Sequence, residues 1–66
     1  MKELYEEKKY LNLRIGETQS EIRINEEKYG KENAEFINEL LRERITEWEK
    51  KIEILNAAEE IILGIR

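Results

Sequence analysis

Residues 34–63 carry the strongest periodic signal in the chain. Large apolar side chains recur there at intervals of three, four or seven residues, which places them in one stripe along a helix face: Ile37, Leu41, Ile45, Trp48, Ile52, Leu55 and Ile62. Further apolar residues widen this stripe near its two ends: Phe36, Leu40, Ile54, Ala58, Ile61 and Ile65. The pattern predicts a helix of about 30 residues, capped by Asn33 and ended by Gly64. Such a helix is longer than a monomer of 66 residues needs, so we expect it to break or to project its C-terminal half beyond the core.

Residues 10–15 show a different pattern, with a period of two. Apolar and polar side chains alternate strictly along this stretch: Leu11, Leu13 and Ile15 are separated by Asn12 and Arg14. Alternation of this kind predicts a short strand with one buried face. Gly16 ends the pattern.

Residues 17–29 allow two interpretations. Thr18 and Glu21 stand in the spacing of a helix capping box, which favours a helix ending at Gly30. Ile22 and Ile24 alternate with polar residues, which also fits a second strand folding back on residues 10–15.

Composition limits what so small a chain can do. The 66 residues form one small domain, and such domains bury only about 60% of their unfolded surface. With no Cys there is no disulfide to add stability, so we expect at least a homodimer. No apolar run reaches the length of a membrane span, and the N-terminus lacks the apolar core of a signal peptide. Together with the absence of Cys, this predicts a cytoplasmic protein.

The residue inventory also opposes catalysis. The chain has no His, Cys or Asp and no glycine-rich phosphate loop, so we expect no enzyme activity, metal or cofactor. The net charge of −4 argues against a sequence-independent coat on nucleic acid.

The predicted order of strand, short helix, glycine and second helix resembles the ribbon-helix-helix family of DNA-binding proteins. YLNLRIGE, residues 10–17, looks like the strand of that family, and YGKENAEFINELLRERI, residues 29–45, is similar to its inter-helix turn and second helix. The resemblance implies a mainly α fold in which residues 10–15 pair antiparallel with the same segment of a second chain. The DNA-binding domain would span residues 10–47 and follow a polar arm, residues 1–9.

The resemblance also implies how double-stranded DNA would be read. A two-stranded ribbon fits the major groove and would direct Tyr10, Asn12 and Arg14 at base edges. Phosphates would be bound by groups beside the ribbon and at the start of the second helix: Lys8, Lys9, Lys31, Asn33 and the Ala34 amide. The implied function is a sequence-specific transcriptional regulator, with repression as its expected action.

Residues 48–66 form a C-terminal extension in this scheme. KKIEILNAAEEIILGIR looks like the C-terminal portion of ParD-type antitoxins. A ribbon-helix-helix core would end near Ile45 or Trp48 and leave apolar residues in need of cover: Trp48, Ile52, Leu55, Ile61, Ile62 and Ile65. These residues predict an interface, either with a toxin as partner protein or with further copies of the chain.

A second hypothesis belongs to another functional class. The chain would be a helical hairpin or a ββα unit that binds a protein through its acidic helix and has no role on DNA. The state of residues 17–29 discriminates between the two hypotheses, because a second strand there, pairing with residues 11–15 of the same chain, would make the ribbon between chains impossible.

Overall fold

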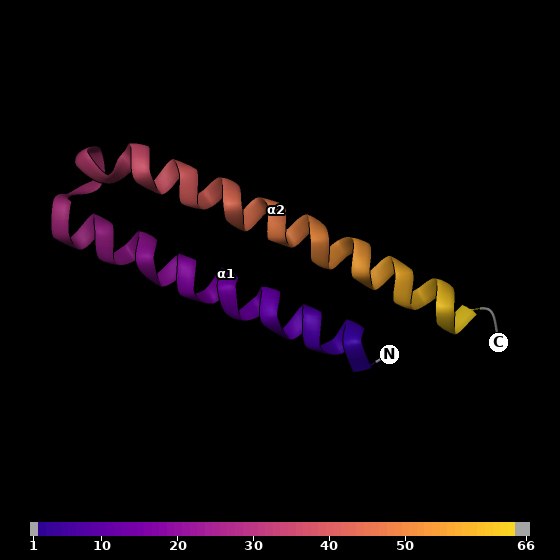
Figure 1. The fold of residues 1–66 in the computed structure, drawn as a ribbon. Coiled ribbons are helices and arrows are strands. Elements are labelled where there is room, and N and C mark those ends of the chain that lie inside the picture. Colours follow the sequence, from indigo (N-terminus) through magenta and orange to yellow (C-terminus); the bar gives the residue numbers. More distant parts are fainter. Residues whose placement is uncertain (1, 65–66) are drawn as a thin grey trace.

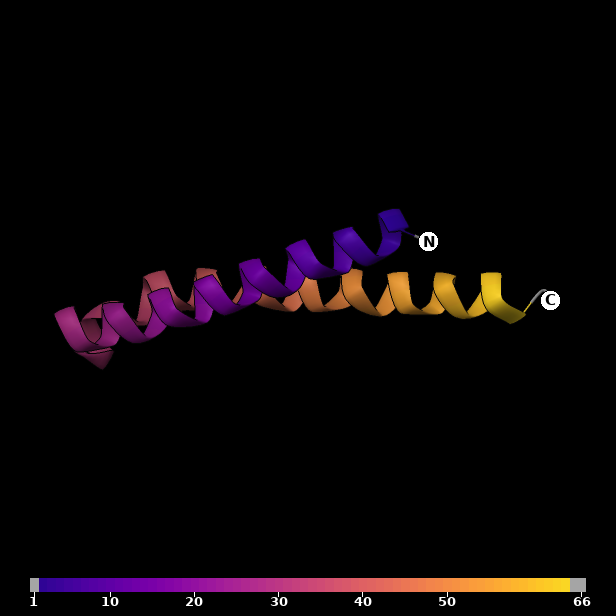
Figure 2. The same cartoon turned by 90° about the horizontal axis from the view of Figure 1, so that it is seen from below.

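The structure, a computed structural model that describes residues 2–64, is an antiparallel hairpin of two long helices (Figure 1). Helix α1 spans Lys2–Tyr29 and helix α2 spans Lys31–Gly64, with Gly30 alone between them. The two helices lie side by side and cross at a shallow angle when seen from below (Figure 2). The molecule is a rod of 52 × 16 × 10 Å, with both chain ends at one end and the turn at the other.

Helix formation follows from local sequence preferences along the chain. Glu, Lys, Leu and Arg, which lose little conformational freedom in a helix, are abundant, and there is no Pro. Acidic Glu3 and Glu32 lie in the first turns of the two helices and Lys28 in the last turn of α1, where each charge complements the helix dipole.

Gly30 makes the turn. Its φ of +85° lies in the left-handed region, which a residue without Cβ adopts at no steric cost. Its amide N–H donates to the Glu26 carbonyl at 2.9 Å, as expected of the residue after a helix end. Its own carbonyl accepts a hydrogen bond from the Ala34 amide at 3.0 Å, so the same glycine also begins α2.

The two helices meet along a seam with the 3-4 spacing of a coiled coil. In α1 this spacing is kept from end to end: Leu4, Lys8, Leu11, Ile15, Thr18, Ile22, Asn25 and Tyr29. In α2 it is kept likewise: Ala34, Asn38, Leu41, Ile45, Trp48, Ile52, Leu55, Glu59 and Ile62. Only Tyr29 and Ile62, at the ends of the seam, are exposed; the other seam residues are buried or half-buried. The core is therefore one line of side chains.

The predicted ribbon-helix-helix fold is wrong, because residues 2–64 contain no strand. Residues 10–15 belong to the middle of α1. Leu11 and Ile15 are one helical turn apart and both face α2, whereas Leu13 points away and is 60% exposed. Leu11 and Ile15 fit both an alternating strand pattern and the i,i+4 spacing of a helix. The helix-forming sequence on both sides of them favours the helix.

Of the other local predictions, some are confirmed and others are wrong. Residues 17–29 are helical and end at Gly30, as one of the two interpretations predicted. Thr18, expected as a cap, is buried in the seam, and α2 begins at Lys31 rather than after Asn33. The predicted long second helix is confirmed, but its C-terminal half packs along α1 as far as Glu59 instead of projecting. Phe36, Ile37 and Leu40, which belong to the predicted apolar stripe, are exposed.

A single seam leaves much surface uncovered. The chain exposes 5557 Å², whereas a compact monomer of this mass exposes about 4,450 Å². Among the described residues, four apolar side chains are buried, which is few for a folded domain: Leu11, Ala34, Leu41 and Ile45. Twelve large apolar side chains are exposed among the described residues, and their placement decides what the hairpin can bind.

Candidate interaction surface

The coiled-coil spacing divides the surface beside the seam into two faces. With the seam residues at heptad positions a and d, positions c and g lie on one side and positions b and e on the other. Shallow grooves confirm this division: one is lined by Glu7 and Lys51 at g positions together with Ile54 at a c position. Another groove is lined by Tyr5, Asn12 and Asn56, all at e positions.

Six of the twelve exposed large apolar residues lie on the first side. We call these residues the apolar face: Tyr10 and Ile24 of α1 with Ile37, Leu40, Ile54 and Ile61 of α2. Near the turn, Ile24, Ile37 and Leu40 form one group; near the chain ends, Tyr10, Ile54 and Ile61 form another. Charged side chains separate the two groups: Arg14, Glu17, Glu21, Arg44, Glu47 and Lys51. Each apolar group is thus bordered by charged side chains, and exposed apolar patches rimmed by polar residues mark interaction sites.

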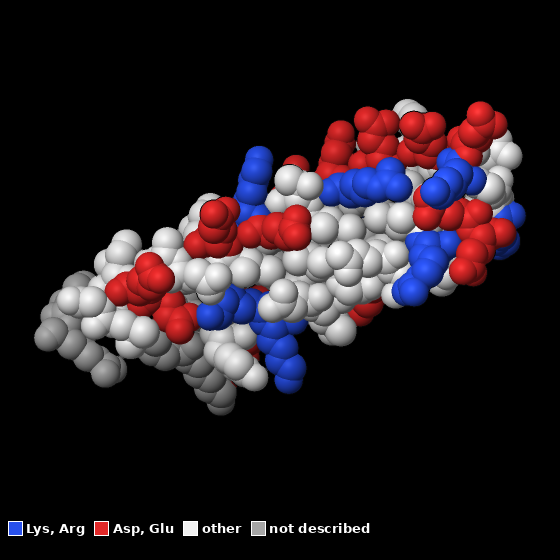
Figure 3. Space-filling model, turned by 180° about the vertical axis from the view of Figure 1, so that it is seen from behind, with Lys and Arg blue, Asp and Glu red and all other residues white. Residues whose placement is uncertain are grey.

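The opposite side, which we call the polar face, comprises positions b and e. Among the described residues of this face, the exposed large apolar side chains are Tyr5 and Leu63, both near the chain ends. Seen from behind, glutamates follow the α2 edge and mixed charges gather near the turn (Figure 3). The Arg42 guanidinium lies 3.9 Å from the Glu26 carboxylate across the two helices, a distance that gives little stability at an exposed site.

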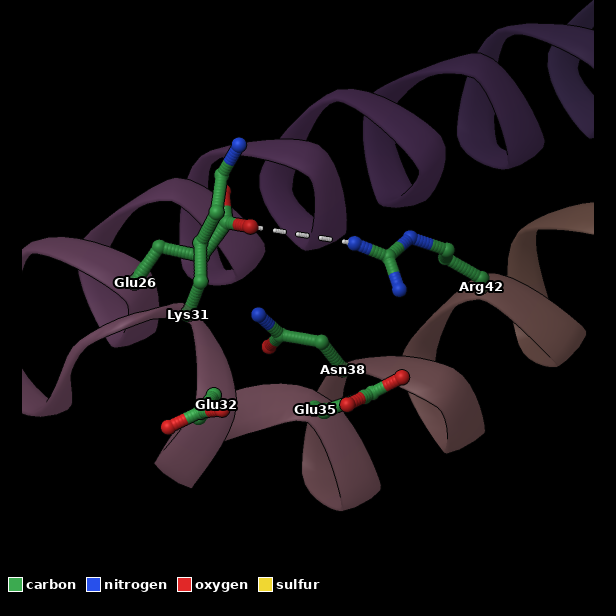
Figure 4. Close-up of a pocket in the computed structure, with 6 residues that line it drawn as sticks. All are labelled: Glu26, Lys31, Glu32, Glu35, Asn38 and Arg42. Atoms are coloured by element: carbon green, nitrogen blue, oxygen red, sulfur yellow. Dashed lines mark ion pairs between the residues drawn. The ribbon is translucent and has the colours of Figure 1, made fainter.

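A polar pocket opens on this face near the turn (Figure 4). It is lined by three glutamates, two cations and an amide: Glu26, Glu32, Glu35, Lys31, Arg42 and Asn38. Acidic groups thus outnumber the cations in the pocket, which leaves it without the excess positive charge that a phosphate site needs. Within residues 2–64 no group of three or more acidic side chains is arranged to hold a metal ion.

The predicted base-reading residues are not brought together. Tyr10 lies on the apolar face and Asn12 on the polar face, on opposite sides of α1. The Arg14 guanidinium lies 5.5 Å from the centre of the Trp48 ring and 3.2 Å from the Glu17 carboxylate. It is half-buried in these contacts, which fix it against its own molecule.

The predicted phosphate-binding residues are split between the two ends of the rod. Lys8 and the exposed Lys9 lie near the chain ends, and Lys8 pairs with Glu59 and donates to the side-chain Oδ1 of Asn56 at 3.2 Å. At the turn end, Lys31 lines the polar pocket, and Asn33 donates its side-chain N–H to the Tyr29 carbonyl. Ala34 is fully buried, and its amide is already bonded to Gly30.

The predicted partner residues of the C-terminal half lie in two different environments. Trp48, Ile52 and Leu55 lie half-buried in the seam against α1. Ile61 and Ile62 remain exposed, and Ile65 lies outside the described residues. Sequence reasoning missed Ile24, Leu40 and Ile54 as surface residues, although their c positions can be recognised once the seam spacing is known.

Comparison with protein-family models, curated proteins and solved structures finds no match to this chain. Neither helix, over the part that the structure describes, has an apolar stretch long enough to cross a membrane.

Proposed function

We propose that this protein is a non-catalytic interaction module, a helical hairpin that associates with a second copy of itself through the apolar face. The two hairpins form a four-helix assembly. The observation that carries the proposal is the concentration of exposed apolar residues at c and g positions, on one side of the seam. Exposed apolar patches with polar borders mark binding surfaces in soluble proteins.

The exposed area supports a second copy as the occupant. The hairpin exposes roughly 1,100 Å² more than a compact monomer of its mass. A standard protein interface removes about 800 Å² from each partner. One copy of the same rod, laid lengthwise on the apolar face, matches this need in both area and length.

Charge supports the same occupant. Positions c and g carry five glutamates and four basic residues, so this side is nearly neutral and does not repel its own copy. Most of the net charge of −4 therefore lies elsewhere on the molecule, where it opposes further association.

This proposal replaces the DNA-binding regulator as the main hypothesis. The ribbon that was expected to read DNA is absent from residues 2–64, and a net charge of −4 opposes binding to phosphate backbones. Binding of double-stranded DNA and of a toxin stay predictions from the family resemblance, and neither is part of the proposed function.

The proposal is tested by measuring the oligomeric state of variants that carry substitutions on the apolar face. Leu40→Glu combined with Ile54→Glu places two charges in the proposed interface, so the dimer should dissociate in analytical ultracentrifugation, with or without loss of helix. Leu63→Glu is the matched control, because it changes an exposed leucine on the polar face. It should leave the dimer and its helix content unchanged. A wild-type chain that stays monomeric at high concentration, or a double variant that still dimerises, contradicts the proposal.

A further inference from the structure

A belt of charged side chains crosses the middle of the apolar face, between its two apolar groups. We call this belt the charged band, and it comprises six residues at c and g positions: Arg14, Glu17, Glu21, Arg44, Glu47 and Lys51. Three of the six are basic and three are acidic, so the band as a whole has no net charge.

The charged band lies at the centre of the rod. It occupies residues 14–21 of α1 and residues 44–51 of α2, and both stretches are near the middle of their helices. The contact between Arg14 and Trp48 places the two stretches at the same level. Two hairpins packed face to face along their length are related by a two-fold axis, which runs either along the helices or across them. Because the band is central, it meets the band of the second copy in both cases, and apolar groups meet apolar groups.

Most charges of the band have no ion-pair partner within the hairpin. The Arg14 guanidinium lies 3.2 Å from the Glu17 carboxylate. The other four side chains are exposed and take part in none of the ion pairs among residues 2–64: Glu21, Arg44, Glu47 and Lys51. Two of these four are acidic and two are basic, so the same residues of a second copy supply an opposite charge for each.

A surface that covers the band must itself carry charges. Charged groups that lose their water and gain no opposite charge make a complex unfavourable. A partner with a continuous apolar surface would cover the two apolar groups but leave the charges between them without partners. A second copy covers apolar groups with apolar groups and places charges of both signs against the band. The interface therefore discriminates between partners at its centre, while the apolar groups supply the attraction.

We propose that the charged band selects the partner of the apolar face, an inference that rests on the proposed dimer. The band restricts association to a surface that carries charges of both signs between two apolar groups, and the second copy is such a surface. A change in the sign of the band should therefore change which chains associate. This expectation holds for either direction of the two-fold axis, since it depends on the band as a whole and not on particular pairs.

Two double variants give the band one dominant sign. Glu21→Lys with Glu47→Lys leaves five basic residues and one acidic residue, and Arg44→Glu with Lys51→Glu leaves five acidic residues and one basic residue. Each variant alone should lose about a hundredfold or more in dimer affinity, because bands of like sign then oppose each other. An equal mixture of the two should form a dimer in analytical ultracentrifugation, because bands of opposite sign attract.

The matched controls make the same charge changes on the polar face. Glu39→Lys with Glu53→Lys, and Lys9→Glu with Arg23→Glu, alter exposed b positions and should dimerise as the wild-type chain does. Circular dichroism of every sample separates loss of the dimer from loss of helix. A band variant that loses helix alone and regains it in the mixture supports the proposal as well, because association then restores the fold.

The outcomes separate the role of the band from the existence of the dimer. Band variants that each dimerise as tightly as a dimeric wild-type chain overturn the selecting role of the band and leave the proposed function intact. Band variants that stay monomeric when mixed, beside a dimeric wild-type chain, do the same. A wild-type chain that is monomeric at high concentration overturns the proposed function and this inference together.

Discussion

Asn38 is the most deeply buried polar side chain of the hairpin, with 1% of its surface exposed. Its side-chain carbonyl accepts a hydrogen bond from the Asn25 amide at 3.1 Å, and its own amide donates to the Ile22 carbonyl at 3.2 Å. A buried asparagine at a seam position costs stability but fixes the alignment of coiled-coil helices, because any other alignment leaves it unpaired. The Asn25–Asn38 pair therefore sets how far α2 is shifted along α1.

Removing one partner of this pair should cost more than removing both. Asn38→Leu leaves the Asn25 amide facing an apolar side chain, and we expect a loss of about 1–3 kcal/mol in the free energy of unfolding. Asn25→Leu together with Asn38→Leu creates an apolar layer and should recover most of that loss. Urea denaturation at one fixed protein concentration measures both. If the single and double variants are equally destabilised, the side-chain hydrogen bond is not what stabilises this layer.

At the scale of the helices, the two interior glycines have opposite roles. Gly16 lies inside α1 with a helical φ, and a Cβ added there would meet no atom within 4 Å. Gly30 has equally free space but a φ of +85°, which a residue with a Cβ adopts only at a cost. The two positions differ in backbone conformation alone, so alanine should change stability with opposite signs.

Gly16→Ala should raise the free energy of unfolding by about 0.5–1 kcal/mol, because alanine loses less conformational freedom in a helix. Gly30→Ala should lower it by about 1–2 kcal/mol through strain in the left-handed conformation. Thermal unfolding followed by circular dichroism gives both values. A stabilising effect of Gly30→Ala, accompanied by a larger particle in solution, indicates instead that α1 and α2 have joined into one continuous helix.

The two helices differ in how well the sequence predicts them. In α2 the apolar stripe and the helix-forming residues agree, so its existence and approximate ends are predictable. In α1 the polar residues Lys8, Thr18 and Asn25 occupy three of the eight seam positions and hide the 3-4 spacing. The alternation of Leu11, Leu13 and Ile15 then has no visible competitor. The helical 3-4 spacing of α1 becomes visible when the polar residues at seam positions are counted together with the apolar ones, and it then outweighs the alternation.

The apolar face was harder to predict than the helices. Leu40 and Phe36 both lie next to the α2 stripe in sequence, and both qualify as core until the seam is located. A helix in a two-helix hairpin contacts only one neighbour, so its buried stripe is narrower than in a globular domain. The breadth of the apolar stripe, wider than a seam of two residues in seven, was the sequence signal for the apolar face.

At the scale of the whole molecule, the proposed dimer makes stability depend on association. A hairpin held by a single seam and no disulfide gains stability when the apolar face is covered, so unfolding of the dimer should depend on protein concentration. Each tenfold dilution should lower the free energy of unfolding per dimer by about 1.4 kcal/mol. For two chains of 66 residues this shifts the melting temperature by roughly 3–6 °C per tenfold dilution. Calorimetry over a hundredfold range of concentration measures the slope, and the Leu63→Glu variant should share it. A melting temperature that does not change on dilution means that each hairpin unfolds alone, with its apolar face uncovered.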